Sequence, residues 1–518
     1  MAFKTMAPEF RVTLYKTVAR RMVTGSDGRT VPTSERYSGG NRVIDLTPFF
    51  GDGSSLETSK SVRQPAGQWG MTVVDQMEAE KMDSLYGLIE PMDVIEIRMR
   101  HRPDPAATGV EPPVVMRGFV SSVRRSMSMS ADGRPARAVT ISGADYGKVL
   151  EMIQIRYLPN YVIGQNLLTV LRAFVNYGIE AKPNQYGNLF VQQIVEKVIN
   201  PFIADMASLG AAAAPTKLSY IREIGYEATA NDGTISAFGA QSAQGTLWDI
   251  LRGFLDVGSW TELFIEDRPD KMADPSRPGG VVLVYRNNPF KDLDPAKGYI
   301  LPQRVAPETL EIGDDAVMSL EIGRSDADVA NYFQVNMPRM NLIDAAAMNL
   351  AGQTNNPDDF YLAKYPNATP KLFGMRFMET DTQMGGADSL GRADGQSAEV
   401  VKREQGKARL WIDDRRAQLM AQNKDNAVFE DGSITLRGQC TLRPGMYLRI
   451  FHGGPGLCLK PFVWECYVVA VQHRMVPFQG FVTVATFKRG TSFAARIRNG
   501  AGRESAYLAE WNQGGALG

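Results

Sequence analysis

Alternating apolar and polar residues predict short strands in the first part of the chain, up to residue 145. The alternation places Ile95, Ile97 and Met99 on one face of a strand at 93–99. The same pattern predicts strands at 115–123 and 139–141. Short strands separated by Gly and Pro favour a small antiparallel barrel or sandwich.

The hydrophobic period changes to that of a helix near residue 145. Tyr146, Val149, Leu150 and Ile153 have helical spacing, and a second helix is predicted over 167–175. Helices are therefore expected to begin near residue 145.

The clearest helix begins at Thr246, which with Asp249 three residues later forms a capping-box type start. Gly258 is placed to end this helix. We expect it to pack on a sheet with strands at 262–267 and 281–285. Its apolar stripe consists of Leu247, Ile250, Leu251, Phe254 and Leu255.

The last two-fifths of the chain return to strand character. A helix at 405–422 interrupts it, and Trp411, Arg415 and Arg416 are interpreted as part of an amphipathic surface helix. Two β-rich units separated by helical and mixed segments suggest an internal duplication, although the sequence shows no residue-level repeat. The strands are expected within 316–336 and at 433–437, 446–451, 462–473 and 481–489.

Composition is that of an ordinary globular protein. The chain has 518 residues, 44% hydrophobic and 22% charged, which is enough for three to five domains. Lys and Arg balance Asp and Glu, so bulk charge does not favour nucleic acid or an anionic membrane. No apolar run reaches the length of a membrane span, and residues 1–20 lack the apolar core of a secretory signal, so we expect a protein made in the cytoplasm without a membrane anchor.

The sequence carries few groups suited to catalysis or metal binding. Its histidines are His101, His452 and His473; a hydrogen-bonding role is favoured for His473, and solvation for His101. Metalloprotease, phosphate-loop and serine-elbow motifs are lacking. We therefore predict no catalytic, cofactor-binding or metal-binding residues, and no enzyme. The cysteines, Cys440, Cys458 and Cys466, are interpreted as reduced core thiols rather than zinc ligands.

Two weaker signals have structural rather than catalytic explanations. The glycines of 453–456 flank a proline between predicted strands, which favours a hairpin turn over a nucleotide loop. The pairs Asp413–Asp414 and Asp314–Asp315 could belong to a glycosidase, but neighbouring residues point apart on a helix or strand.

Four sequence motifs follow one another along the chain. The first combines 115–120 with 139–146, and the second joins the helix from Thr246 to the acidic strand 262–267 and to 284–290. The third covers 318–335, and the fourth combines 436–445 with 467–473 and 481–490. In this order the four motifs resemble the baseplate hub family of bacteriophage tails, which is related to the base of type VI secretion spike proteins. Residues 185–245 and 340–405 match no motif of that family.

The resemblance implies a mixed α+β, β-rich fold with two tail-tube-like antiparallel β-barrel domains and helical and α+β inserted domains. The expected boundaries are a first barrel at 1–145, an inserted domain at 146–310, a second barrel at 311–345 with 430–490, a polar and helical insertion at 346–429, and a tail at 491–518. The tail is either disordered or an arm ordered by a partner, with Tyr507, Leu508 and Trp511 as its anchors.

The implied function is that of a structural hub in the virion tail baseplate. A homotrimer with two barrels per subunit would form a six-fold-like ring, adapting the hexameric tail tube to a trimeric spike. Its partners would be the tail tube or distal tail protein, the spike and the baseplate wedge proteins, and DNA would meet it only in transit through the lumen. The alternatives are a virion-associated peptidoglycan hydrolase and a spike or tube subunit of a bacterial contractile injection machine.

Overall fold

A computed structural model provides the three-dimensional structure. It describes residues 8–17, 19–28, 30–37, 43–75, 84–101, 111–129, 135–155, 186–207, 220–230, 234–235, 245–272, 274–289, 307–336, 366–382, 384–385, 398–424, 426–451, 462–477 and 479–492.

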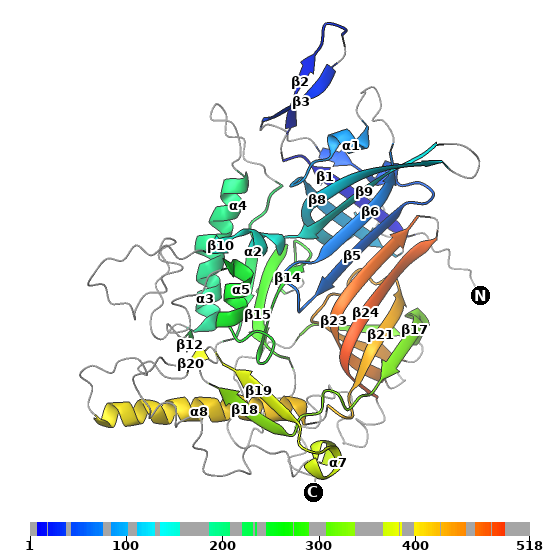
Figure 1. The fold of residues 1–518 in the computed structure, drawn as a ribbon. Helices are drawn as coiled ribbons and strands as arrows, with labels where there is room; N and C mark the ends of the chain where they lie inside the picture. The colour runs from blue at the N-terminus through cyan, green and yellow to red at the C-terminus, as the bar shows by residue number, and fades with distance from the viewer. Residues whose placement is uncertain are drawn as a thin grey trace.

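A single 13-stranded sheet forms the centre of the protein (Figure 1). Along its main path the strand order is β17-β21-β24-β23-β5-β6-β9-β8-β7-β1-β4, and β16 and β22 extend it beside β23. Strands from the two ends of the sequence therefore belong to the same sheet.

The first β unit comprises the strands before residue 146. Its core is formed by apolar residues that alternate along these strands, among them Leu56, Met71, Ile95 and Ile141. The strands are β1 (Glu9–Tyr15), β4 (Val43–Asp45), β5 (Ser55–Ser61), β6 (Gln68–Val74), β7 (Val94–Arg100), β8 (Val114–Met129) and β9 (Pro135–Asp145), with the short helix α1 (Leu85–Leu88).

The second β unit comprises strands from the last two-fifths of the chain. Its separate core contains Ile434, Leu448, Val471 and Phe487. The strands are β16 (Thr309–Gly313), β17 (Val317–Gly323), β21 (Glu430–Arg437), β22 (Tyr447–Phe451), β23 (Phe462–Val476) and β24 (Gly480–Ser492).

The two units share one strand order. The first runs β5-β6-β9-β8-β7 and the second β17-β21-β24-β23-β22, and every neighbouring pair in both is antiparallel. The registers also reveal a short repeat that the sequence alone did not show. Ser55-Leu56-Glu57 of β5 occupies the positions of Ser319-Leu320-Glu321 of β17, because Leu56 lies opposite Met71 as Leu320 lies opposite Ile434.

The β-rich prediction is confirmed, but the described strands contain no closed barrel. The path of the sheet ends at β17 on one side and at β4 on the other. The physical reason is that β5 and β23 pair with each other across the units, so each unit extends its sheet into the other and neither closes on itself.

A mixed unit of helices and a three-stranded sheet lies beside the large sheet (Figure 1). As predicted, Thr246 caps the helix α5 by accepting a hydrogen bond from the Asp249 amide at 3.1 Å, and the apolar stripe of α5 packs against the sheet. The elements are α2 (Lys148–Met152), β10 (Gln154–Ile155), α3 (Gly187–Ile194), a π-helix (Val195–Ile199), α4 (Asn200–Ala207), β11 (Gly225–Ala228), β13 (Gly245–Thr246), α5 (Leu247–Phe254), β14 (Thr261–Asp267) and β15 (Val281–Asn287).

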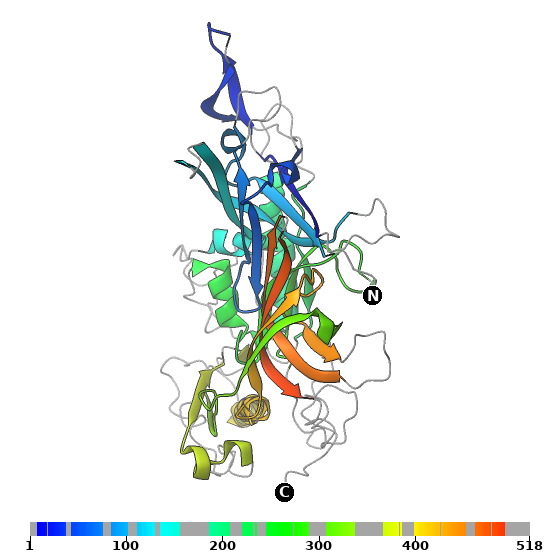
Figure 2. The ribbon, with the colours of Figure 1, turned by 90° about the vertical axis from the view of Figure 1, so that its right-hand side faces the viewer.

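The remaining elements lie at the two ends of the molecule (Figures 1 and 2). The hairpin of β2 (Ala19–Thr24) and β3 (Thr30–Tyr37) projects beyond the first unit, and the long helix α8 (Ala398–Asn423) lies at the opposite end. Near α8 are β18 (Tyr332–Asn336), β19 (Phe377–Asp381) and α7 (Pro370–Phe373). The short strands β12 (Thr234–Ile235) and β20 (Met384–Gly385) pair with each other.

The strands predicted from alternation at 93–99, 115–123 and 433–437 are confirmed as β7, β8 and β21. The predicted helix at 167–175, the hairpin turn at 453–456 and the tail at 491–518 lie outside the described residues, except for the last two residues of β24.

Candidate functional site

The junction between the two β units is the candidate functional site, and we define it as the paired strands β5 and β23 with the side chains beside them. Ser61 to Leu56 lie opposite Ala470 to Met475 in antiparallel register. Leu56 and Met475 form its last cross-strand pair, and both are fully buried. The junction therefore has an apolar end made from both units.

A buried lysine occupies the other end of the junction. The Lys60 ammonium lies 2.9 Å from a carboxylate oxygen of Asp145, and it also donates a hydrogen bond to Asp267 at the end of β14. Burial disfavours the charged amine, but these two carboxylates outweigh it and raise the pKa of Lys60. Burial in turn raises the pKa of Asp145 despite the nearby ammonium. One cation thus links the first unit to the mixed unit.

Beside Lys60, three arginines and three glutamates form a closed ring of alternating charge. Arg268 and Glu266, Glu266 and Arg443, Arg277 and Glu227, and Glu227 and Arg268 are joined by ion pairs with nitrogen–oxygen distances of 2.6–2.9 Å. Burial opposes ionisation of Glu227, but hydrogen bonds from Arg277 and Arg268 hold its pKa at about 2. In order, the ring is Arg268, Glu266, Arg443, Glu308, Arg277 and Glu227, and back to Arg268.

A second arginine network attaches β15 to the second unit. Arg286 donates to Glu262 at 3.0 Å, to the Tyr467 hydroxyl at 3.2 Å and to the Gly445 carbonyl at 2.7 Å. Gly445 has a φ of 85°, and a Cβ there would lie 2.6 Å from the Arg286 guanidinium. Glycine favours this backbone turn, and its lack of a Cβ leaves room for the close approach of the arginine.

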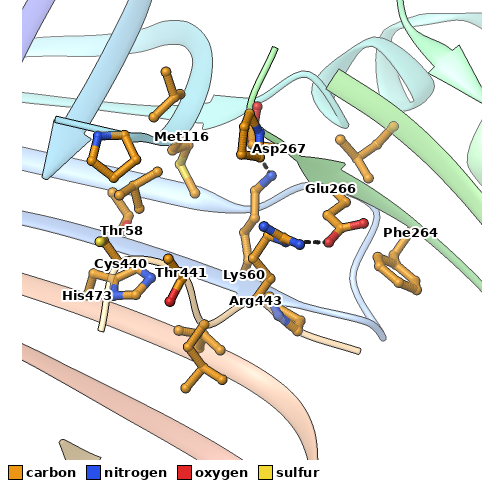
Figure 3. A pocket seen from close by; sticks show the side chains of 18 residues that line it. Thr58, Lys60, Met116, Phe264, Glu266, Asp267, Cys440, Thr441, Arg443 and His473 are labelled. Atoms are coloured by element: carbon orange, nitrogen blue, oxygen red, sulfur yellow. Dashed lines mark hydrogen bonds and ion pairs between the residues drawn. The ribbon is translucent and has the colours of Figure 1, made fainter. Parts of the chain in front are cut away.

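A small cavity lies among these side chains (Figure 3). Lys60, Asp267, Glu266 and Arg443 face one another on one side of it, and His473 lies toward the other side. The free space is about 50 Å³, which is room for a few waters and far less than the several hundred Å³ of a substrate site. The arrangement can hold strands together in a defined register, and it offers no room for a substrate of ordinary size.

His473 has the hydrogen-bonding role that was predicted for it. Its Nδ1 lies 3.0 Å from the Thr483 hydroxyl, and burial lowers the pKa of His473 to about 4. The ring is therefore neutral at pH 7. His101 is half-buried rather than freely solvated, and its Nδ1 is buried. His452 lies outside the described residues.

The described cysteines are free thiols. Cys440 is half-buried and Cys466 is buried, which raises the pKa of both, and Cys458 lies outside the described part of the chain. Within the described residues, no group of three or more His, Cys, Asp or Glu side chains is arranged to hold a metal ion.

The two pairs of neighbouring carboxylates have separate surroundings. Asp413 accepts from Arg416 at 2.5 Å, whereas burial and the charge of Asp413 raise the pKa of Asp414. Asp314 and Asp315 are exposed in a 3₁₀ turn before β17.

The interpretation of the helix at 405–422 as a surface helix is wrong for Arg416, which is 5% exposed, and for Arg415. This residue is fully buried, and its guanidinium lies 5.0 Å from the Trp260 ring and 4.3 Å from the Trp411 ring. Trp260 also donates to the Arg415 carbonyl at 3.0 Å. Packing on Trp260 thus buries one face of α8 that its charged composition had suggested was solvated.

The sequence interpretation did not identify the ionic groups at the junction. The acidic strand at 262–267 was the available signal, because three of its residues, Glu262, Glu266 and Asp267, are carboxylates in a strand whose seven residues are all buried. Carboxylates in a buried strand require cations opposite them. Lys60, Arg286 and Arg443 supply those cations here.

Comparisons with known proteins identify structural neighbours but no sequence relatives. No protein-family model matches this sequence, and no curated protein matches it. Among solved structures, similarity is found to a tail protein from Neisseria meningitidis MC58, with 11% identity, a TM-score of 0.38, and coverage of 92% of this chain and 96% of that one.

Two further neighbours are of related kinds. A 43 kDa tail protein of prophage MuSo2 from Shewanella oneidensis has 11% identity, a TM-score of 0.40, and coverage of 93% and 98%. An E. coli component of the type VI secretion system, described as structurally similar to the bacteriophage T4 tail proteins gp27 and gp5, has 9% identity, a TM-score of 0.32, and coverage of 84% and 73%. These three neighbours are thus two tail proteins, one of them from a prophage, and a type VI secretion component.

The described helices include none long and apolar enough to cross a membrane.

Proposed function

We propose that this chain is a structural ring protein, the hub of a phage tail baseplate, and that three copies form one ring. Each copy would contribute its two β units as two neighbouring segments of that ring. The proposal assigns the protein an architectural role rather than a catalytic one.

The single observation that carries the proposal is the doubled strand order joined at the junction. Two units with the same order, β5-β6-β9-β8-β7 and β17-β21-β24-β23-β22, lie side by side through the pairing of β5 with β23. Two similar units placed side by side by a repeatable contact generate a ring when the rotation between them closes. Three such chains would then present six similar units.

The buried charges at the junction support this role. The alternating arginine and glutamate ring attaches the second unit to the mixed unit, and the pair of Lys60 with Asp267 attaches the first unit to it. Groups of this kind constrain geometry more than they add stability, because the desolvation of buried charges offsets most of their attraction. A fixed angle between the two units is what a subunit of a closed ring requires.

On this proposal the partners are other parts of the tail. A six-fold-like face would contact the tail tube or distal tail protein, and the three-fold character of the ring would match a trimeric spike and the surrounding wedge proteins. The protein would act in the virion, at the baseplate, with DNA passing through the lumen during ejection.

Native mass spectrometry and electron microscopy of the purified protein test the proposal. The expected result is a species with three times the 57.0 kDa mass of the chain, seen as a ring of six similar lobes. A protein that stays monomeric over the whole accessible concentration range, or a ring with another copy number, would contradict it.

A further inference from the structure

The junction uses one edge of each β unit and leaves the opposite edges open. Among the described strands, β17 pairs only with β21, and the outer half of β8 from Ser122 to Met129 pairs only with β9. Both open edges carry large exposed apolar side chains. Met127 is 62% exposed and Leu320 is 40% exposed. An open strand edge with exposed apolar residues is a template for pairing with another chain.

The strand registers establish which residues of the two units are equivalent. In each unit, one row of directly opposed residues crosses the four strands on the core side of the sheet. The row in the first unit is Leu56, Met71, Ile141 and Val123, and the row in the second unit is Leu320, Ile434, Ala485 and Val471. Leu320 of β17 is thus the counterpart of Leu56 of β5, and Val123 of β8 is the counterpart of Val471 of β23.

Irregular features of the backbone confirm this alignment independently. The register of β8 shifts between Val120 and Ser122, and that of β23 shifts at the same place, between Val468 and Ala470. Each strand also exchanges two backbone hydrogen bonds with a turn whose residue has positive φ. In the first unit this residue is Met92, with a φ of 74°.

In the second unit the turn residue is Gly445, with a φ of 85°. The Gly445 amide donates to the Val468 carbonyl, as the Met92 amide donates to the Val120 carbonyl. Two bulges and two turns at matching positions make β8 the counterpart of β23 and β17 the counterpart of β5.

The junction inside the chain therefore shows how the two open edges can pair. At the junction Met475 lies opposite Leu56, and neither is exposed. The counterparts of these two residues are Met127 and Leu320, which lie on the open edges. The buried apolar pair of Met475 and Leu56 therefore has an exposed equivalent, with Met127 on one free edge and Leu320 on the other.

Charge follows the same correspondence. At the junction Gln472 donates a hydrogen bond to Glu57. Their counterparts, one residue beyond Val123 and one beyond Leu320, are Arg124 and Glu321, and both are exposed. Where the internal junction has an amide and a carboxylate, the open edges carry opposite charges that favour each other across an interface between chains.

We propose that β8 of one copy pairs antiparallel with β17 of a second copy, with Met127 opposite Leu320 and Arg124 beside Glu321. The occupant of each open edge is another molecule of this chain, and the sheet continues from copy to copy in the register of the internal junction. This inference rests on the proposed ring and specifies the contact that closes it.

Cysteine cross-linking tests the register. Residues directly opposite each other on antiparallel strands have Cα atoms about 4.5–5.5 Å apart, which suits a disulfide. The double variant Met127→Cys with Leu320→Cys should form covalent dimers and trimers on mild oxidation, whereas each single variant should not. A matched control is Ser128→Cys with Leu320→Cys, whose side chains lie on opposite faces of the sheet and should remain uncross-linked.

A charge exchange provides a second test without cysteines. Arg124→Glu should weaken self-association by about fivefold or more per contact, because it replaces an attraction by a repulsion. Combining it with Glu321→Arg should restore association to near the original level. Sedimentation velocity measures the association, and circular dichroism checks that each variant remains folded. We expect the variants to fold because both residues are exposed.

The outcomes separate this inference from the proposed function. Trimeric rings with no cross-link at 127 and 320 and no effect of the charge exchange would overturn the strand pairing and leave the ring intact. A protein that never associates would overturn both. Cross-links in the double variant but not in the control would support the pairing and its register.

Discussion

The two β units have the same strand order, but equivalent residues in them meet different surroundings. Leu56 of β5 is fully buried because β23 covers it, whereas its counterpart Leu320 of β17 is 40% exposed. Met475 and Met127 differ in the same way. The difference shows that the position of a unit within the assembly, and not its local strand pattern, decides whether an edge is buried.

The units also differ at their far edges. In the first unit β1 pairs antiparallel with β7, whereas in the second β16 pairs parallel with β22. β16 follows directly from the mixed unit, while β1 lies near the start of the chain. The strand order therefore repeats in the strands that include the junction pair β5 and β23. The outer strands β1 and β16 differ because the chain enters each unit by a different route.

The largest expected effect comes from placing a charge on each of the equivalent leucines. Leu56→Lys should lower the free energy of unfolding by about 5 kcal/mol or more, because it removes a buried side chain and buries an ammonium between Met71 and Met475. Leu320→Lys should change the stability of the dilute protein by less than about 0.5 kcal/mol. Urea unfolding at low protein concentration measures both free energies of unfolding. Equal losses in the two variants would contradict the expected difference between Leu56 and Leu320.

A somewhat smaller effect is expected from removing the cation at the junction. Lys60→Met leaves Asp145 and Asp267 buried without their partner and should cost about 3–5 kcal/mol. The loss should shrink as the pH falls, because burial raises the pKa of Asp145 and Lys60 lowers it, so without Lys60 this pKa rises further and the folded variant takes up a proton before the unfolded chain does.

Lys488→Met is the matched control for this variant. Lys488 pairs with Asp328 at 3.3 Å on the surface, so its removal should alter stability by less than about 1 kcal/mol. Similar losses for the two lysines would show that the junction ion pairs do not hold the units together.

The smallest effect is a pH dependence that belongs to the second unit. Because burial lowers the pKa of His473 from 6.5 to about 4, the unfolded chain binds a proton at this position before the folded one does. The contribution of the neutral His473 ring to the free energy of unfolding is therefore fully present above pH 6.5, and it falls by about 3 kcal/mol as the pH drops to 4. In the first unit the counterpart of His473 is Arg125, so that unit has no histidine at this position.

The variant His473→Gln isolates this contribution. Its unfolding free energy, measured between pH 8 and pH 4, should fall less steeply than that of the original protein, with the two curves diverging below pH 6.5. Parallel curves would mean that His473 is accessible to protons in the folded state.

Individual elements could be predicted where one face of them is buried. The alternation in β7, β8 and β21, and the capped stripe of α5, are signals of a single buried face, and the structure contains each of these elements. Such patterns depend only on which side of an element faces the core, so they can be read without knowing the partner.

The junction could not be predicted by the same reasoning. Along β5 the only large apolar residue is Leu56, and the other positions are Ser, Thr, Glu and Lys, so its sequence resembles a loop or an exposed segment. Its partner β23 is about 400 residues away, and alternation indicates a face but never the neighbouring strand. Likewise, Arg415 is buried only because Trp260, from a distant segment, lies against it.

The ring of alternating arginines and glutamates has a consequence for synthesis on the ribosome. Five of its members precede residue 310, but Arg443 is translated much later. Until that residue emerges, Glu266 and Glu308 lack the guanidinium that joins them, and the ring of ion pairs is incomplete. The nascent mixed unit therefore carries an excess of negative charge at this place, which Arg443 of the second unit neutralises once it is in position.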